Sequence, residues 1–168
     1  ISFLSPGLRF FHQGQFEGKK LKISPHLVRG PKEPVQSGLE NFYNQLLEVL
    51  KMPVFHNGTF LLIEPLPAWE GNGSCDSFLA FAWKGSDNRA ALVCVNYASY
   101  SGQCRLRLPF SGLTGSTCIL TDQFSSIRYQ RDGNELLQDG LYLDMPAWNY
   151  HVFEITKTTT SGNVENSG

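Results

Sequence analysis

The residues best suited to bind a polar ligand lie together near the N-terminus, directly after the apolar run Leu8–Phe11. They are His12, Gln13 and Gln15, and Glu17 follows in the same short segment. An apolar run that ends in polar residues is typical of a buried parallel strand that delivers hydrogen-bonding groups to a loop. The pattern therefore predicts that His12, Gln13 and Gln15 form part of the rim of a binding cleft.

A purely structural interpretation of this segment stays open. Side chains of tight turns often satisfy backbone groups of the turn itself, which would equally explain His12, Gln13 and Gln15. Gly14 and Glu17 are expected to hold the loop in place, because glycine permits a tight turn. Glu17 alone cannot supply both the acid and the base of two-carboxylate chemistry. We therefore expect no catalytic residue in this segment.

Aromatic residues are the second candidate feature. Trp69 and Tyr100 lie among residues that favour turns, and we interpret them as possible platforms for stacking on sugar rings. The alternative is packing in a core, which is the commoner role of aromatic residues in β-rich domains.

Metal ligands and nucleophilic relays are not indicated. His26, His56 and His151 are far apart and have no recognisable ligand spacing. Several aspartates fall at predicted turns or strand ends, where we expect them to be solvated: Asp122, Asp132, Asp139 and Asp144. We expect neither a metal site nor a cofactor.

Two kinds of element would position these groups. After the strand Leu8–Phe11, the proline- and glycine-rich residues 19–36 predict an irregular connection. Ser37 as N-cap, with Glu40 completing a capping box, then predicts a helix that ends before Pro53. Its apolar face recurs at helical spacing and comprises Leu39, Phe42, Tyr43, Leu46, Leu47 and Leu50. A strand, a loop and such a helix make one βα unit.

Beyond Pro53 the pattern changes to short strands separated by turns. The predicted strands are Thr59–Ile63, Ser77–Trp83, Ala90–Tyr97, Gln103–Leu108, Thr117–Thr121, Ile127–Gln130, Glu135–Leu137, Gly140–Leu143 and Tyr150–Ile155. Such spacing is typical of an antiparallel β-sandwich, so the chain is expected to be mainly β. Residues 157–168 are polar and lack aromatic side chains, which predicts a disordered tail.

Composition excludes several classes of partner. The formal net charge of the 168 residues is −1, and the basic residues are scattered, which argues against nucleic acid and anionic membranes. No apolar run approaches the length needed to span a bilayer. The four cysteines show no CxxC pairing, and their disulfide state stays open. The compartment also stays open, with a cytoplasmic setting preferred over secretion.

Several segments, in a consistent order, resemble the C-terminal part of the alpha-amylase superfamily of glycoside hydrolases. The similar segments are Gly7–Glu17, Phe42–Leu47, His56–Phe60, Leu79–Trp83, Ala91–Tyr97 and Met145–Phe153. In that family a (β/α)8 barrel closes with its eighth strand and helix and is followed by a β-sandwich called domain C. The resemblance implies that residues 1–53 are the last βα unit, a barrel remnant, and that residues 54–156 are domain C.

The resemblance also implies a function. The family cleaves or transfers α-glucosidic bonds with a carboxylate nucleophile and a carboxylic acid about 5 Å apart. Its catalytic carboxylates lie on barrel strands four, five and seven, so none maps onto this chain. We therefore expect a non-catalytic portion of an enzyme that supports the barrel, with the N-terminal barrel of the same protein as its partner. The alternative is a stand-alone module that binds α-glucan or another oligosaccharide.

Overall fold

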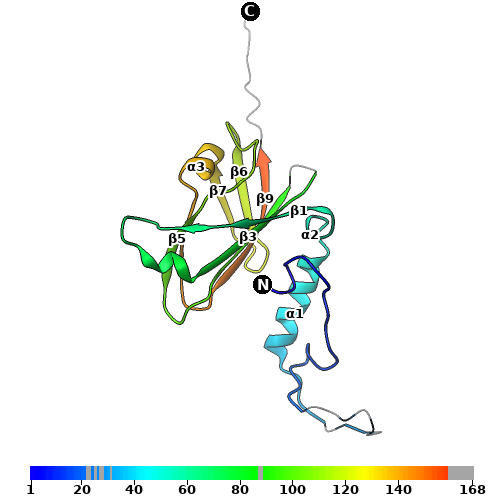
Figure 1. Cartoon of the computed structure of the whole chain (residues 1–168). Helices are drawn as coiled ribbons and strands as arrows, with labels where there is room; N and C mark the ends of the chain where they lie inside the picture. Colours follow the sequence, from blue (N-terminus) through cyan, green and yellow to red (C-terminus); the bar gives the residue numbers. More distant parts are fainter. Residues whose placement is uncertain (22–23, 25, 27–28, 31, 87–88, 159–168) are drawn as a thin grey trace, which may run out of the picture. The chain divides into compact units, whose positions relative to one another are not determined.

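The computed structural model describes residues 1–21, 24, 26, 29–30, 32–86 and 89–158. The chain divides into two compact units (Figure 1). Residues 2–52 form the first, and Ile1 with the described residues from Pro53 onward forms the second.

An aromatic cluster holds the first unit together. The rings of Phe16 and Tyr43 stack with centroids 4.9 Å apart, and those of Phe3 and Phe11 stack at 4.4 Å. Phe11 also meets Phe16 and Tyr43 edge to face. Because Tyr43 lies on helix α1 (Ser37–Leu50), these contacts fasten the N-terminal segment to that helix.

The N-terminal segment is not a strand, and this prediction was wrong. Residues 8–11 have no helical or strand structure, and the Leu8 side chain is 94% exposed. A parallel strand needs a neighbouring strand to pair its backbone groups. Among the described residues no strand pairs with Leu8–Phe11, so its apolar character does not produce a ladder. The connection 19–36 contains no described helix or strand, and residues 22–23, 25, 27–28 and 31 lie outside the described residues.

The predicted helix is confirmed, but its start is different. Gln36, not Ser37, occupies the N-cap position and offers no side-chain cap. Instead its backbone carbonyl accepts hydrogen bonds from the N–H groups of Leu39 and Glu40, both at 3.0 Å. The expected apolar face is buried at Leu46 and Leu50, joined by Val49. Periodicity therefore located this helix better than its capping pattern did.

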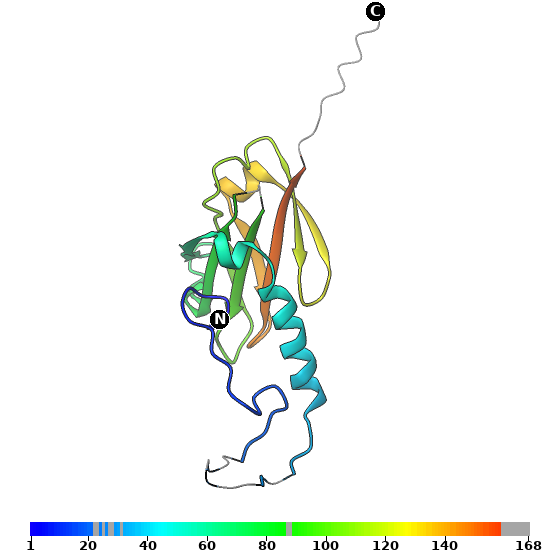
Figure 2. The same ribbon diagram turned by 90° about the vertical axis from the view of Figure 1, so that its right-hand side faces the viewer.

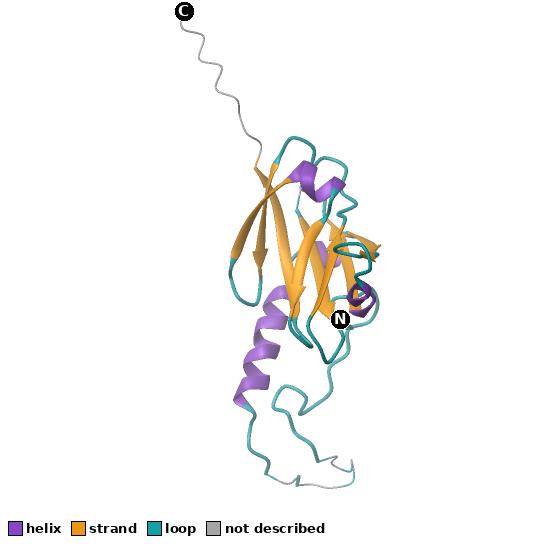
Figure 3. Cartoon of the chain, turned by 90° about the vertical axis from the view of Figure 1, so that its left-hand side faces the viewer, coloured by secondary structure: helices purple, strands orange, loops and turns teal. Residues whose placement is uncertain are grey.

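The second unit is built from antiparallel strands (Figure 3), which confirms the expectation of a mainly β chain. A six-stranded sheet has the order β1-β3-β4-β9-β6-β7, and a three-stranded sheet has the order β2-β5-β8. The strands are β1 (Thr59–Ile63), β2 (Pro65–Leu66), β3 (Phe78–Lys84), β4 (Ala90–Asn96), β5 (Gly102–Leu106), β6 (Thr117–Asp122), β7 (Arg128–Asp132), β8 (Leu141–Met145) and β9 (Tyr150–Thr158). The two remaining short elements before β3 are α2 (Val54–Asn57) and the 3₁₀ turn η1 (Gly73–Ser77).

Both sheets contribute to one hydrophobic core, and Figure 2 shows the second unit from the side. The six-stranded sheet supplies Leu92, Leu120 and Phe153, and the three-stranded sheet supplies Leu106 and Met145. Strands β5 and β8 bury every second residue, as expected for a sheet with one apolar face.

Two predictions about the second unit need correction. The segment Glu135–Leu137 is not a strand but part of helix α3 (Gly133–Gln138). Asp132 caps this helix, since its carboxylate accepts hydrogen bonds from the N–H groups of Asn134 and Glu135. Of the predicted tail 157–168, Lys157 and Thr158 continue β9, and residues 159–168 lie outside the described residues.

Gly133 is needed at the start of α3 because there is no room for a side chain. A Cβ atom placed there would lie 1.9 Å from the carbonyl oxygen of Leu113. We expect Gly133→Ala to lower the free energy of unfolding by about 2–4 kcal/mol, measured by urea denaturation. Gly73→Ala is the control, since a Cβ atom there meets nothing within 4 Å. Equal stability of the two variants would contradict this account.

Candidate functional site

The predicted rim residues lie in a compact turn of the first unit. His12 and Gln13 are exposed, and Gln15 is partly buried. The amide of Gln15 donates to the hydroxyl of Tyr43 at 2.8 Å, and its carbonyl oxygen accepts from the His12 N–H at 3.2 Å. Gln15 is therefore occupied in holding the turn against α1, whereas the exposed His12 has its ring Nδ1 3.1 Å from the backbone carbonyl oxygen of Gln13.

Gly14 and Glu17 also take part in this turn. Gly14 is buried with φ of +85°, a conformation that favours glycine, and its carbonyl accepts from the Lys19 N–H at 2.9 Å. The backbone carbonyl of Glu17 accepts from the N–H of Gln36 at 3.0 Å, next to the start of α1. These backbone bonds tie the turn to the helix, and the proposed roles of the side chains stay predictions.

The two aromatic residues singled out from the sequence are both exposed. Trp69 lies in the turn after β2, where its carbonyl accepts from the Asn72 N–H. Tyr100 lies between β4 and β5, and its hydroxyl is 2.8 Å from the Ser77 hydroxyl. Exposure leaves both available for ligand contact, and sugar stacking by them stays a prediction.

A further exposed aromatic pair lies on the second unit. The rings of Tyr97 and Trp148 meet edge to face with centroids 5.5 Å apart, and both are more than half exposed. Trp148 has φ of +57°, which bulky residues rarely adopt. Such a conformation costs on the order of 1–3 kcal/mol and persists only where its surroundings fix it. Here the Trp148 N–H donates to the carbonyl of Ala98.

Asn96 fixes the loops that carry these aromatic residues. Its side chain is fully buried, and its amide nitrogen lies within 3.0 Å of the carbonyl oxygens of Tyr100, Met145 and Pro146. The loop after β4 and the turn before β9 are thereby held together. We call the surface formed by Tyr97, Tyr100 and Trp148 the aromatic patch; Tyr97 and Tyr100 both bond Ser77, through its carbonyl and its hydroxyl respectively.

The interpretation of Asp122 as a solvated turn residue was wrong. Its side chain is 3% exposed and accepts a hydrogen bond from His151 Nδ1 at 2.8 Å. Ser125 Oγ and the Phe124 N–H also donate to this carboxylate. Burial acts to raise the pKa of Asp122, but these hydrogen bonds outweigh it and lower the pKa. Because Ser125 and His151 both bond the carboxylate, the group forms a structural network and not a nucleophile–base relay.

A shallow groove lies beside this network. It consists of two hollows, of about 150 and 380 Å³, which are lined by residues of β7 and β8. Arg131, Leu141 and Tyr142 border both hollows. Its two tyrosine rings are already engaged, since Arg131 lies 5.7 Å over Tyr129 and Arg105 lies 5.7 Å over Tyr142. These cations occupy one face of each ring, so the groove offers less stacking surface than the aromatic patch.

Two features are absent from the described residues. No group of three or more histidine, cysteine or acidic side chains there has a geometry that could hold a metal ion. No helix in the described part of the chain is long and apolar enough to cross a bilayer.

The chain has the fold of a segment of solved alpha-amylases. It superposes on a maltogenic alpha-amylase, AmyB, from Thermotoga neapolitana with a TM-score of 0.62 and 18% identity, over 92% of this chain and 35% of that one. The alpha-amylase of Geobacillus thermoleovorans gives a TM-score of 0.65 and 15% identity, over 94% of this chain and 32% of that one. An Anoxybacillus alpha-amylase gives a TM-score of 0.50 and 16% identity, over 74% of this chain and 24% of that one.

The chain thus spans about a third of the length of the first two enzymes. No family model matches the sequence, and no curated protein matches it. Similarity at this level of identity shows a shared fold, and function has to be argued from the site.

The buried carboxylate network predicts a specific dependence of stability on pH. Because the folded-state pKa of Asp122 is lowered, its contribution to stability is present above its unfolded pKa, near 4, and is lost as the pH falls through the folded value. We expect Asp122→Asn to lower the free energy of unfolding at pH 7 by about 1–3 kcal/mol. Below about pH 5 the free energy of unfolding of this variant should decrease less steeply with falling pH than that of the wild type. Chemical denaturation between pH 3 and 8 measures both.

The matched control is Asp139→Asn, which removes an exposed carboxylate after α3. It should leave the pH profile of the wild type unchanged. An Asp122→Asn profile parallel to that of the wild type would contradict the assignment.

Proposed function

We propose that this chain is the C-terminal, non-catalytic portion of an alpha-amylase-like glycoside hydrolase that acts on α-glucosidic carbohydrates. Residues 54–156 form its β-sandwich, equivalent to domain C, and residues 1–53 belong to the end of its (β/α)8 barrel. The role of the chain is to cover and support the barrel, which lies elsewhere in the same protein. The fold shared with alpha-amylases and the share of their length that it covers support this proposal.

The observation that carries the proposal is a second apolar face on the six-stranded sheet. The pairing places Phe60, Leu62, Leu79 and Phe81 on the side that faces away from the core shared with β5 and β8. Leu62 is 75% exposed, and Leu79 is also exposed. Monomeric proteins rarely leave contiguous apolar surface of this kind uncovered, so a further partner on this face is expected.

Part of the same face shows how it is covered. Phe55 of α2 meets the ring of Trp83 edge to face, and Phe60 packs on Trp83 and Phe81 from β1. Leu62 and Leu79 lie on the same face of β1 and β3 and are exposed. In the first unit Leu8 and Phe10 are exposed as well. Full burial of one such side chain contributes about 1.5–3 kcal/mol, so a barrel covering them would be held firmly.

The catalytic residues of the proposed enzyme lie outside this chain. Retaining hydrolysis needs two carboxylates about 5 Å apart across the scissile bond. The buried carboxylate of Asp122 is already bonded to His151, Phe124 and Ser125. The chain itself is therefore expected to be inactive on α-glucans, and Glu17→Gln to have no catalytic effect.

The gene tests this proposal directly. Reading upstream of the codon for Ile1 should reveal at least about 250 further residues with a βα-repeat pattern and acidic residues at strand ends. A start codon immediately before Ile1 would contradict the proposal.

The apolar face gives a biophysical prediction. In the chain as given, Leu62→Ser with Leu79→Ser should reduce self-association at high concentration and change the free energy of unfolding by less than about 1 kcal/mol. Analytical ultracentrifugation and urea denaturation measure these quantities. Ile127→Ser, which alters an exposed apolar residue between β6 and β7, should leave self-association unchanged. A decrease of more than about 2 kcal/mol in the free energy of unfolding of the double variant would mean that Leu62 and Leu79 are buried within the folded chain, and would contradict an exposed face.

A second function, oligosaccharide binding, is favoured by the aromatic patch. Exposed rings stack on the apolar faces of sugars, and the strained Trp148 is held in place by the backbone of Ala98. This function is compatible with a stand-alone module as well as with an enzyme. Unlike the sequence-based candidate Trp69, Trp148 has an aromatic neighbour, Tyr97, against which it is fixed.

Retention on insoluble starch measures this second function. Trp148→Ala should weaken retention at least about fivefold, a loss of roughly 1 kcal/mol, and Trp148→Phe should retain most of it. Trp69→Ala is the comparison variant for the residue chosen from the sequence. Retention that depends on Trp69 and not on Trp148 would reject the patch, and no retention by the wild type would reject the function.

A further inference from the structure

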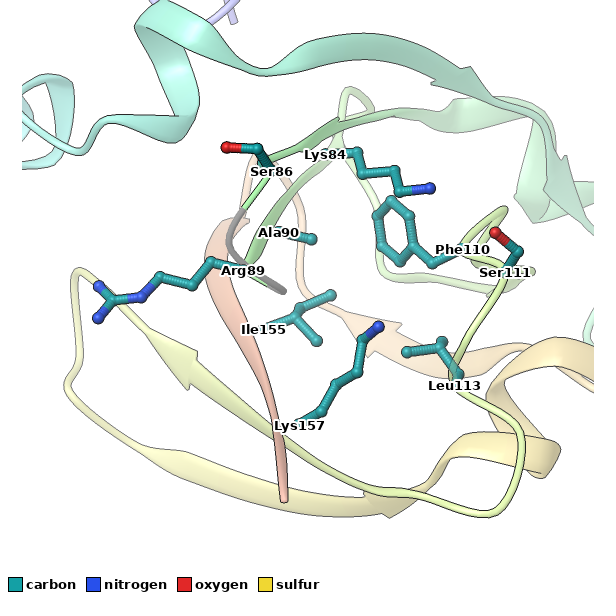
Figure 4. A pocket seen from close by; sticks show the side chains of 10 residues that line it. Lys84, Ser86, Arg89, Ala90, Phe110, Ser111, Leu113, Ile155 and Lys157 are labelled. Carbon is teal, nitrogen blue, oxygen red and sulfur yellow. The ribbon is translucent and has the colours of Figure 1, made fainter. Parts of the chain in front are cut away.

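A small basic hollow lies in the second unit (Figure 4). It has a volume of about 250 Å³ and is lined by the end of β3 with Gly85 and Ser86, by Arg89 and the start of β4, by the segment before β6, and by the last part of β9. Lys84 and Lys157 contribute its charged groups, and Ser86 and Ser111 contribute hydroxyls. Figure 4 shows both lysine side chains directed toward the side of Phe110 and Leu113.

The two lysines occupy positions where the pattern of the sheet calls for core residues. Lys84 follows Ala80 and Ala82 on the core-facing side of β3, and Lys157 follows Phe153 and Ile155 on β9. At these strand ends Lys84 is exposed to solvent and Lys157 is partly buried. Among the described residues neither lysine has a carboxylate within ion-pair distance, and no acidic residue is among those that line the hollow.

The neighbouring cation behaves differently and provides a contrast. Arg89 also borders the hollow, but its guanidinium is 3.5 Å from the carboxylate of Glu154. In Figure 4 its side chain points away from the two lysines. Within the described part of the chain, Lys84 and Lys157 are therefore the cations at the hollow for which no ion pair is seen.

The shape of the hollow preserves space at one of these amino groups. Gly112 has φ of +111°, and a Cβ atom there would lie 3.2 Å from Lys157 Nζ. The floor is apolar and buried, since Phe110, Leu113 and Ile155 are almost fully inaccessible. The lining of the hollow thus combines two ammonium groups with an apolar surface.

We propose that this hollow binds the phosphate group of a small ligand, either the free ion or a phosphate ester. A phosphate carries about −1.5 to −2 charges at pH 7, which the two lysines balance, and its oxygens accept from lysine and serine donors. A carboxylate, with one charge and a planar shape, matches a forked arginine better than two separate ammonium groups. This inference is independent of the proposed glycosidase role.

Calorimetric titration of the full chain at low ionic strength tests the proposal, with inorganic phosphate, glucose 6-phosphate and neutral glucose as probes. We expect one or both phosphates to bind and glucose not to bind. Tighter binding of glucose 6-phosphate identifies an ester as the ligand, and equal or tighter binding of inorganic phosphate identifies the free ion. Absence of binding by both phosphates overturns the proposal.

Charge-matched variants locate the binding site. Lys84→Gln and Lys157→Gln should each weaken phosphate binding about tenfold or more, as expected for loss of a hydrogen bond to a charged group. Arg89→Gln removes the same charge from the rim and should change the affinity less than about twofold, because its guanidinium faces Glu154. Equal losses in all three variants would reveal a general effect of net charge and overturn the assigned site.

Discussion

Strand β4 is apolar on both faces, and the arrangement of the second unit depends on this property. All its residues from Ala90 to Cys94 are buried, and it pairs with β3 on one side and β9 on the other. Strands β5 and β8 instead alternate between buried and accessible residues. The three-stranded sheet therefore needs cover on one face only, whereas the centre of the six-stranded sheet needs it on both. The core beneath β5 and β8 covers one of these faces. On the other face Ala91 and Val93 are buried as well, and exposed apolar side chains lie further along, at Leu62 of β1 and Leu79 of β3.

The polar and strained features lie where this apolar strand ends. At its C-terminal end Asn96 is buried and binds carbonyl oxygens of two loops, which fixes the turn containing Trp148. The amide nitrogen of Asn96 is satisfied in this way, whereas its buried Oδ1 has no hydrogen-bond partner among the described residues. At its N-terminal end the neighbouring strands place Lys84 and Lys157 at core-facing positions. One end carries the aromatic patch, and the other carries the basic hollow.

The parts of the fold that the sequence predicted are those with a long, regular pattern. The helical spacing from Leu39 to Leu50 and the apolar run at Ala91–Val95 both gave the correct element, because burial of many residues specifies it. Helix α3 was missed because six residues are too few to show helical periodicity, and its start depends on the Asp132 cap and on the space at Gly133. The prediction of a strand at Leu8–Phe11 was wrong because an apolar run forms a strand only where a neighbouring strand pairs with its backbone.

The candidate sites were harder to predict because they depend on contacts between distant residues. Asp122 and His151 are 29 positions apart, and only the pairing of β6 with β9 brings them to 2.8 Å. Trp148 owes its position to a backbone conformation that no local pattern indicates, and Lys84 and Lys157, far apart in the sequence, come to line one hollow only through the fold. Gln15, by contrast, was correctly placed in a turn, but its bond to Tyr43 gives it a structural role that its polarity did not distinguish from ligand binding. Residue type indicated which groups could act, and tertiary pairing decided which of them are free to do so.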